Sequence, residues 1–106
     1  MKNMKKYDKL VRDKIPKIIK ENGKKCKTRK MKPDEVSHYF QAKILEELEE
    51  LFENPCAEEM SDVMEAVDCL RKAFNLPIEE VIDVKHKKRE ERGSFQKGII
   101  LLEVSE

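Results

Sequence analysis

Apolar residues recur at helical spacing along most of this chain, and prolines and glycines interrupt the pattern at a few points. A short helix is predicted from about Lys14 to Asn22, because isoleucines share one face there: Ile15, Ile18 and Ile19. Pro16 suits its first turn, and Gly23 suits a C-terminal cap. Residues 24–31 lack a helical stripe, so we expect them to be extended.

Two long helices are predicted in the middle of the chain. Pro33 and the two acids after it make a favourable first turn for a helix that runs to about Glu53. Its apolar stripe is Ile44, Leu45, Leu48, Leu51 and Phe52. After Asn54 and Pro55, the second helix is predicted from about Cys56 to Phe74, with Met60, Val63, Ala66, Val67, Leu70 and Phe74 as its apolar face. Because the connection is short, the two helices are expected to be antiparallel.

The last part of the chain predicts one more helix and an apolar tail. Asn75, Leu76 and Pro77 break the pattern, and a helix with Ile78, Val81 and Ile82 on one face should then run to about Arg92, where Gly93 ends it. Residues 95–104 include Ile99, Ile100, Leu101 and Leu102, which are too apolar to lie freely in water. We therefore expect the tail to pack on another element or across an oligomer interface.

These elements predict an all-α fold: an antiparallel bundle of about four helices in a single domain that spans residues 1–106. Charged residues make up 42% of the chain, against about 25% in an average domain, so apolar residues are confined to narrow stripes. Much of each helix must then face water or a partner subunit. A homodimer or larger homo-oligomer is expected, since helices of this length bury little surface in a monomer.

Some classes of protein are disfavoured by composition. No segment approaches the roughly 20 apolar residues that span a membrane, and no apolar signal region follows the lysine-rich start. The three cysteines are odd in number and form no Cys-x-x-Cys pair, which argues against a disulfide framework and a zinc site. A cytoplasmic, reducing location is expected.

The net charge of +1 conceals a separation of charge along the chain. Residues 1–32 carry fourteen Lys or Arg and three acids, a net +11, whereas residues 33–106 carry nine basic and nineteen acidic residues, a net −10. A basic segment attracts phosphates and an acidic cluster attracts cations, so a metal-bound polyphosphate would suit both. Alternatively, the two parts neutralise each other on a solvated surface.

The acidic residues with the most informative spacing lie on the two long helices. Glu47 and Glu50 are three residues apart and lie on one flank of the first, and Glu59 and Asp62 have the same spacing on the second. Glu59 falls within the apolar arc of its helix, where a solvated acid would not be expected. Convergence of the four carboxylates would require a cation, and oxygen ligands alone favour Mg²⁺, with Mn²⁺ as a substitute. The alternative is two acidic helix faces that only solvate the surface.

Three stretches of this chain resemble the all-α NTP pyrophosphohydrolase (MazG-like) superfamily. They are Tyr7-Asp8-Lys9-Leu10-Val11-Arg12-Asp13-Lys14-Ile15-Pro16, the Glu-Glu-x-x-Glu pattern with a later Glu-x-x-Asp, and Lys88-Arg89-Glu90-Glu91-Arg92-Gly93-Ser94-Phe95. The similarity is greatest to the small house-cleaning group related to phosphoribosyl-ATP pyrophosphohydrolase. Ser94 stands where that group more often has a second glycine.

The resemblance implies a function and a set of site residues. It implies that Glu47, Glu50, Glu59 and Asp62 are the metal ligands and catalytic carboxylates. It also implies Mg²⁺-dependent hydrolysis of a nucleoside triphosphate between the α and β phosphates, giving a nucleoside monophosphate and pyrophosphate, in sanitation of the nucleotide pool. Basic residues of the first and last stretches are expected to bind the substrate phosphates, Arg12 and Arg92 above all: Lys9, Arg12, Lys14, Lys88, Arg89 and Arg92.

Two other functions compete with this one. A nucleic-acid-binding module could use the basic first segment, but that segment has a single aromatic residue, Tyr7, and the acidic remainder would repel a polyanion. A non-catalytic helical assembly protein would need its acids only for solubility. Dependence on Mg²⁺ and release of pyrophosphate would separate the enzyme from both.

Overall fold

Every regular element in the computed structural model, which describes residues 4–106, is a helix. The elements are α1 (Ile15–Glu21), the 3₁₀ turn η1 (Pro33–Glu35), α2 (Val36–Glu53), α3 (Ala57–Ala73) and α4 (Ile78–Arg92). The predicted all-α class is confirmed for this range, and residues 24–31 form neither helix nor strand. None of the described helices is long and apolar enough to cross a membrane.

The helix ends follow from the residues at the breaks. Gly23 adopts a φ of +78°, and its N–H donates to the carbonyl of Lys20 at 3.0 Å, which closes α1. The long helix predicted from Pro33 begins as the single turn η1, in which the N–H of Lys32 donates to Glu35 Oε1 at 2.9 Å. Gly93, with a φ of +81°, ends α4 as predicted.

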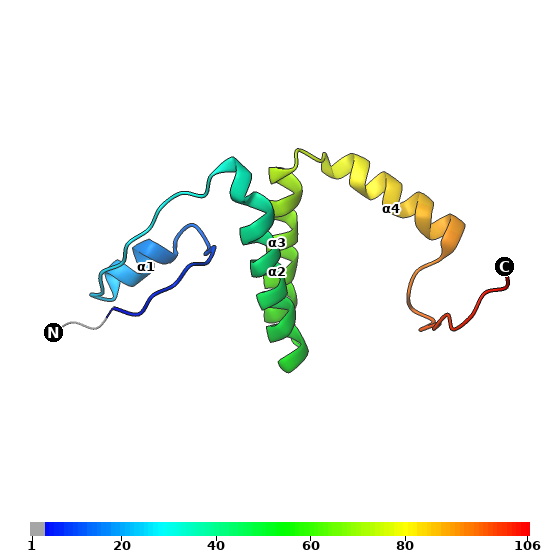
Figure 1. Cartoon of the computed structure of the whole chain (residues 1–106), viewed down its shortest axis with the longest axis horizontal. Coiled ribbons are helices and arrows are strands. Elements are labelled where there is room, and N and C mark those ends of the chain that lie inside the picture. Colours follow the sequence, from blue (N-terminus) through cyan, green and yellow to red (C-terminus); the bar gives the residue numbers. More distant parts are fainter. Residues whose placement is uncertain (1–3) are drawn as a thin grey trace. The chain divides into compact units, whose positions relative to one another are not determined.

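Helices α2 and α3 pack side by side (Figure 1). Residues 54–56 connect them, so the predicted antiparallel pair is present. The side chains between them are only half-buried: Ile44, Leu48, Leu51, Val63, Ala66 and Leu70. Among the described residues, just Phe40 and Glu47 are buried, with exposed fractions of 8% and 6%.

Part of the predicted apolar faces is exposed, which corrects the sequence analysis. Leu45 is 53% exposed and Phe52 80% exposed on α2, while Met60, Val67 and Phe74 lie near one-half exposure. The apolar stripe of a helix in a globular domain spans an arc of about 100° or more. A single neighbouring helix covers only part of that arc, so one flank of the stripe stays exposed. Within residues 4–74, that flank of each helix remains exposed.

The chain divides into two compact units, Met1–Phe74 and Asn75–Glu106. The second unit contains α4, none of whose side chains is buried, and the apolar tail. In the tail, Phe95 is fully exposed and Leu102 is 85% exposed, so the expected packing does not occur within this unit. Packing across an oligomer interface and a single domain over residues 1–106 remain predictions.

Candidate metal centre

Three of the four predicted metal ligands converge at the interface of α2 and α3. Glu47 and Glu50 come from successive turns of α2, and Glu59 comes from the start of α3, which runs back along α2. One carboxylate oxygen from each residue lies within 4.8 Å of the others. The spacing seen in the sequence therefore places these three acids together, on two helices that pack against each other.

The burial of Glu47 distinguishes the acidic cluster from a solvated helix face. Glu47 is the most buried of the described residues, and its Oε2 atom, like Oε2 of Glu59, has no hydrogen-bond partner among residues 4–106. The charge of Glu47 raises the pKa of Glu50, and desolvation and the charge of Glu59 raise it further. Buried, unpaired carboxylate oxygens are costly, and a cation between them would remove the repulsion.

The donor set of the acidic cluster fits a hard divalent ion. All three side chains offer carboxylate oxygens, which suit Mg²⁺ or Mn²⁺ and not the softer ions that thiolates select. Glu50 is exposed, so one side of the cluster is open to solvent. Phosphate oxygens and water could complete the coordination from that side.

The fourth predicted ligand, Asp62, lies one turn further along α3 and has a different partner. Arg12 Nη2 donates to Asp62 Oδ1 at 2.7 Å, and this hydrogen bond raises the pKa of Arg12. Asp62 is not among the three carboxylates that converge. An ion pair with a residue fifty positions earlier in the chain thus occupies the carboxylate that the sequence assigned to a metal.

Arg12 belongs to an N-terminal strap, residues 8–12, which crosses the α2–α3 pair. Lys9 Nζ donates to Glu46 Oε1 at 2.8 Å, and the hydrogen bond raises the pKa of Lys9 and lowers that of Glu46. At Asp8, the end of the strap opposite Arg12, the hydroxyl of Tyr39 donates to Oδ1 at 2.6 Å. The strap therefore holds two of the predicted phosphate-binding residues, Lys9 and Arg12, against acids that adjoin the acidic cluster, Glu46 and Asp62.

Two neighbours of the site were not identified from the sequence. Lys43 Nζ lies 3.0 Å from Glu47 Oε1 and 3.6 Å from Glu46 Oε2. Tyr39 connects the strap to Arg29, because Arg29 Nη2 donates a hydrogen bond to the Tyr39 hydroxyl at 3.0 Å. The spacing of four residues between Lys43 and Glu47 was a usable signal, whereas nothing local marks Tyr39.

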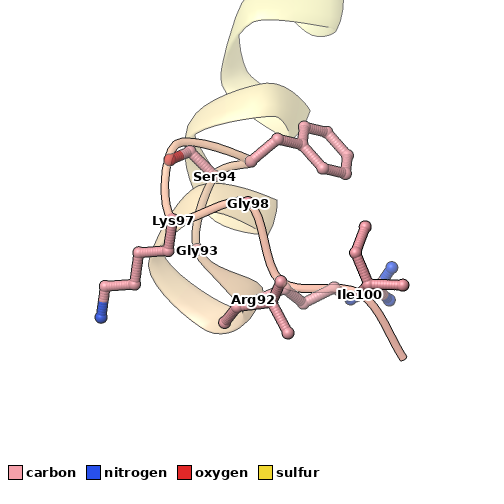
Figure 2. Close-up of a pocket in the computed structure, with 8 residues that line it drawn as sticks. Arg92, Gly93, Ser94, Lys97, Gly98 and Ile100 are labelled. Atoms are coloured by element: carbon pink, nitrogen blue, oxygen red, sulfur yellow. The ribbon is translucent and has the colours of Figure 1, made fainter. Parts of the chain in front are cut away.

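The other predicted phosphate-binding residues lie outside the acidic cluster. Lys14 is exposed at the N-terminus of α1. Lys88, Arg89 and Arg92 belong to the second unit and are exposed on α4. There the chain turns back after the helix, and Arg92, Gly93, Gly98 and Ile100 surround a hollow of about 460 Å³ (Figure 2).

The loop that forms this hollow tolerates serine at position 94. Asn75 is the single non-glycine residue with a positive φ in the described chain, so Ser94 adopts an ordinary backbone conformation. Ser94 Oγ accepts a hydrogen bond from the N–H of Gln96 at 3.3 Å. The second glycine that is common in the resembling group is not required by this backbone.

The chain was compared with family models, with curated proteins and with solved structures. No family model, curated protein or solved structure matches it. The assignment of a function therefore depends on the acidic cluster, its basic neighbours and the motifs of the sequence.

Proposed function

We propose that this protein is a Mg²⁺-dependent nucleoside triphosphate pyrophosphohydrolase of the MazG-like type. The observation that carries the proposal is the convergence of Glu47, Glu50 and Glu59, in which Glu47 is buried and two carboxylate oxygens lack a hydrogen-bond partner among the described residues. A solvated acidic face would not bury Glu47 to this extent. The motifs of the first and last stretches supply the substrate class.

In this proposal the cluster holds the ion, and the strap meets the substrate. Glu47, Glu50 and Glu59 would hold the ion, and the unpaired oxygens of Glu47 and Glu59 are available for it. When bound, Mg²⁺ supplies neutralisation of charge on the phosphate oxygens and activation of the attacking water. Arg12 can exchange Asp62 for a phosphate, because the guanidinium pairs bidentately with either anion. Asp62 is then free to join the other acids.

The reaction needs no covalent nucleophile from the protein. The oxygen of a water molecule bonds to the α phosphorus, the bond from that phosphorus to the α–β bridging oxygen breaks, and pyrophosphate leaves with the electron pair. A carboxylate of the acidic cluster orients the water and accepts its proton. Such transfer depends mainly on positioning and charge neutralisation, for which the acids and the strap provide the groups.

We further propose that the protein acts as a homo-oligomer. The uncovered flanks of α2 and α3 and the exposed tail present apolar surface on both units. A second copy, which carries the same surfaces, would cover them.

A panel of nucleoside triphosphates, canonical and modified, tests the proposed function. Each is incubated with the protein with and without Mg²⁺, and the products are separated by ion-exchange chromatography. We expect equal amounts of nucleoside monophosphate and pyrophosphate from at least one substrate, with no turnover in excess chelator. Release of single phosphates, or no hydrolysis of any member of the panel, would contradict the proposal.

A further inference from the structure

Lys43 has an environment unlike that of the other lysines near the acidic cluster. It lies one turn before Glu47 on α2, and its side chain is 17% exposed. Its ammonium nitrogen is 3.0 Å from Glu47 Oε1, whereas Oε2 of the same carboxylate is buried without a hydrogen-bond partner among the described residues. The two oxygens of Glu47 therefore differ: one is held and the other is available.

We propose that Lys43 is a positioning residue that holds Oε1 of Glu47 and thereby presents Oε2 to the divalent ion. This inference rests on the proposed function, because it assigns Glu47 a ligand role. Carboxylates that bind metals are usually oriented by a hydrogen bond to their second oxygen. Lys43 lies on the same helix and places its ammonium nitrogen 3.0 Å from that oxygen, at a spacing of four residues that brings the two side chains together.

Lys9 offers a matched comparison for this role. It forms an ion pair of similar length, 2.8 Å, but with Glu46, whose oxygens are outside the three-acid cluster. The Lys9 and Glu46 side chains are also more exposed, at 41% and 33% against 17% and 8% for Lys43 and Glu47. Both lysines place a positive charge near the site, but only Lys43 contacts a proposed ligand.

The two possible effects of Lys43 on cation binding have opposite signs. If only its charge matters, removing the ammonium lowers the repulsion felt by a divalent ion and tightens binding. If it positions Glu47, removing it leaves the carboxylate free to rotate and weakens binding. Loss of such an orienting partner typically costs about 10–100-fold in metal affinity. The sign of the change thus separates the two accounts.

The test measures binding of Mn²⁺ alone, without nucleotide, by isothermal titration calorimetry on the full chain. We expect Lys43→Met to bind about 10–100-fold more weakly than the wild type, and Lys43→Arg, which retains a donor, to recover most of the loss. The control Lys9→Met should bind equally or more tightly. Equal or tighter binding by Lys43→Met, or an arginine variant as weak as the methionine variant, would overturn the role of Lys43.

A crystal structure of the wild-type Mn²⁺ complex decides the question if Lys43→Met does not fold. Glu47 should bind the ion through Oε2 while Lys43 Nζ stays within hydrogen-bond distance of Oε1. An ion bound through both oxygens of Glu47, or a lysine that has moved away, would overturn the inference alone. A wild-type chain that takes up no Mn²⁺ would instead overturn the proposed function, and the role of Lys43 with it.

Discussion

The unit that contains α2 and α3 differs from the unit that contains α4 in what its charged side chains contact. In the first unit, Lys9 and Arg12 reach acids 37 and 50 positions away in the sequence. In the second, the ion pair between Lys87 and Asp83 spans a single helical turn. Long-range ion pairs and a buried acid thus occur in the unit that carries the proposed metal centre.

The apolar residues of the two units show a related difference. Phe40 and the half-buried side chains between α2 and α3 give the first unit a small interior. The tail of the second unit leaves Ile99, Ile100 and Leu101 at least three-quarters exposed. We infer that the first unit is organised around its site, whereas the second unit needs another surface to cover it.

Removing the acids of the cluster should have the largest effect. Glu47→Gln, Glu50→Gln and Glu59→Gln should each lower pyrophosphate release by more than about 100-fold, because loss of an outer-shell partner alone costs 10–100-fold. Without metal, Glu50→Gln and Glu59→Gln should be as stable as the wild type or more stable, since repulsion within the cluster is relieved, whereas Glu47→Gln also loses its ion pair with Lys43. Thermal unfolding in chelator measures this second effect.

Exposed glutamates on the same helices provide the controls for those variants. Glu49→Gln on α2 and Glu58→Gln on α3 remove the same charge next to the cluster. Both should retain nearly full turnover. Normal activity in all three cluster variants, or equal losses in the control variants, would show that position within the cluster is irrelevant.

The next largest effect is expected at Arg12, which joins the strap to α3. Arg12→Ala should lower catalytic efficiency about tenfold to hundredfold, as one charge-assisted contact to phosphate is lost. Mg²⁺ affinity without nucleotide should stay the same or improve, because Asp62 no longer has its 2.7 Å partner. Arg12→Lys should recover part of the efficiency.

Arg92 of the second unit offers a parallel variant. Arg92→Ala should lower efficiency similarly if α4 contributes to phosphate binding, as its motif implies. If either alanine variant hydrolyses substrate normally and unfolds at a lower temperature, that arginine has a structural role instead.

The next prediction concerns the oligomeric state, which we expect to depend on the exposed tail. Light scattering of the wild type should give at least twice the chain mass of 12.5 kDa. Introducing charge at two tail positions, Ile100→Asp with Leu102→Asp, should lower the mass to that of one chain, because charged side chains are costly to bury. The control Lys97→Asp should not. A wild-type mass of 12.5 kDa would contradict the proposed oligomer.

The smallest effect is expected at Arg29, which makes two 2.8 Å hydrogen bonds to Glu35. These bonds, together with the N–H of Lys32, lower the pKa of Glu35 to about 2 from an ordinary 4.5. The pair therefore stabilises the folded chain fully above pH 4.5, and the stabilisation is lost as the pH falls towards 2. An exposed pair contributes little.

Thermal unfolding as a function of pH checks the Arg29 pair. Arg29→Met should lower the melting temperature by about 1–4 °C at pH 7, and the difference from the wild type should shrink below pH 4.5. Lys27→Met, which removes a nearby exposed charge, serves as the control. A difference that is constant down to pH 2 would mean that the pair does not contribute in this way.

The positions of the helices could be predicted because their signals are local. Pro33, Asn54 and Gly93 interrupt the apolar pattern, and the structure changes element close to each of them. The extent of burial could not be read in the same way. Leu45 and Phe52 continue the stripe of α2 but are exposed, since periodicity does not reveal how many neighbours a helix has.

The candidate site, like the fold, could be predicted from the sequence only in part. Spacing and an antiparallel pair, which are regular features of helices, allowed Glu47, Glu50 and Glu59 to converge, and the family resemblance selected them as ligands. The ion pair of Asp62 with Arg12 could not be predicted, because Arg12 lies in a segment without regular structure and the contact spans fifty residues. Long-range contacts of irregular segments leave no periodic signal in a sequence.

Titration with Mg²⁺ in the absence of nucleotide tests the central claim, that buried acids at the α2–α3 interface hold a divalent ion. Calorimetry on the wild type, Glu59→Gln and Glu58→Gln compares a half-buried member of the cluster with its exposed neighbour. We expect the wild type and Glu58→Gln to bind alike and Glu59→Gln to bind at least about 100-fold more weakly. Equal binding by all three proteins, or no binding by the wild type, would contradict the account.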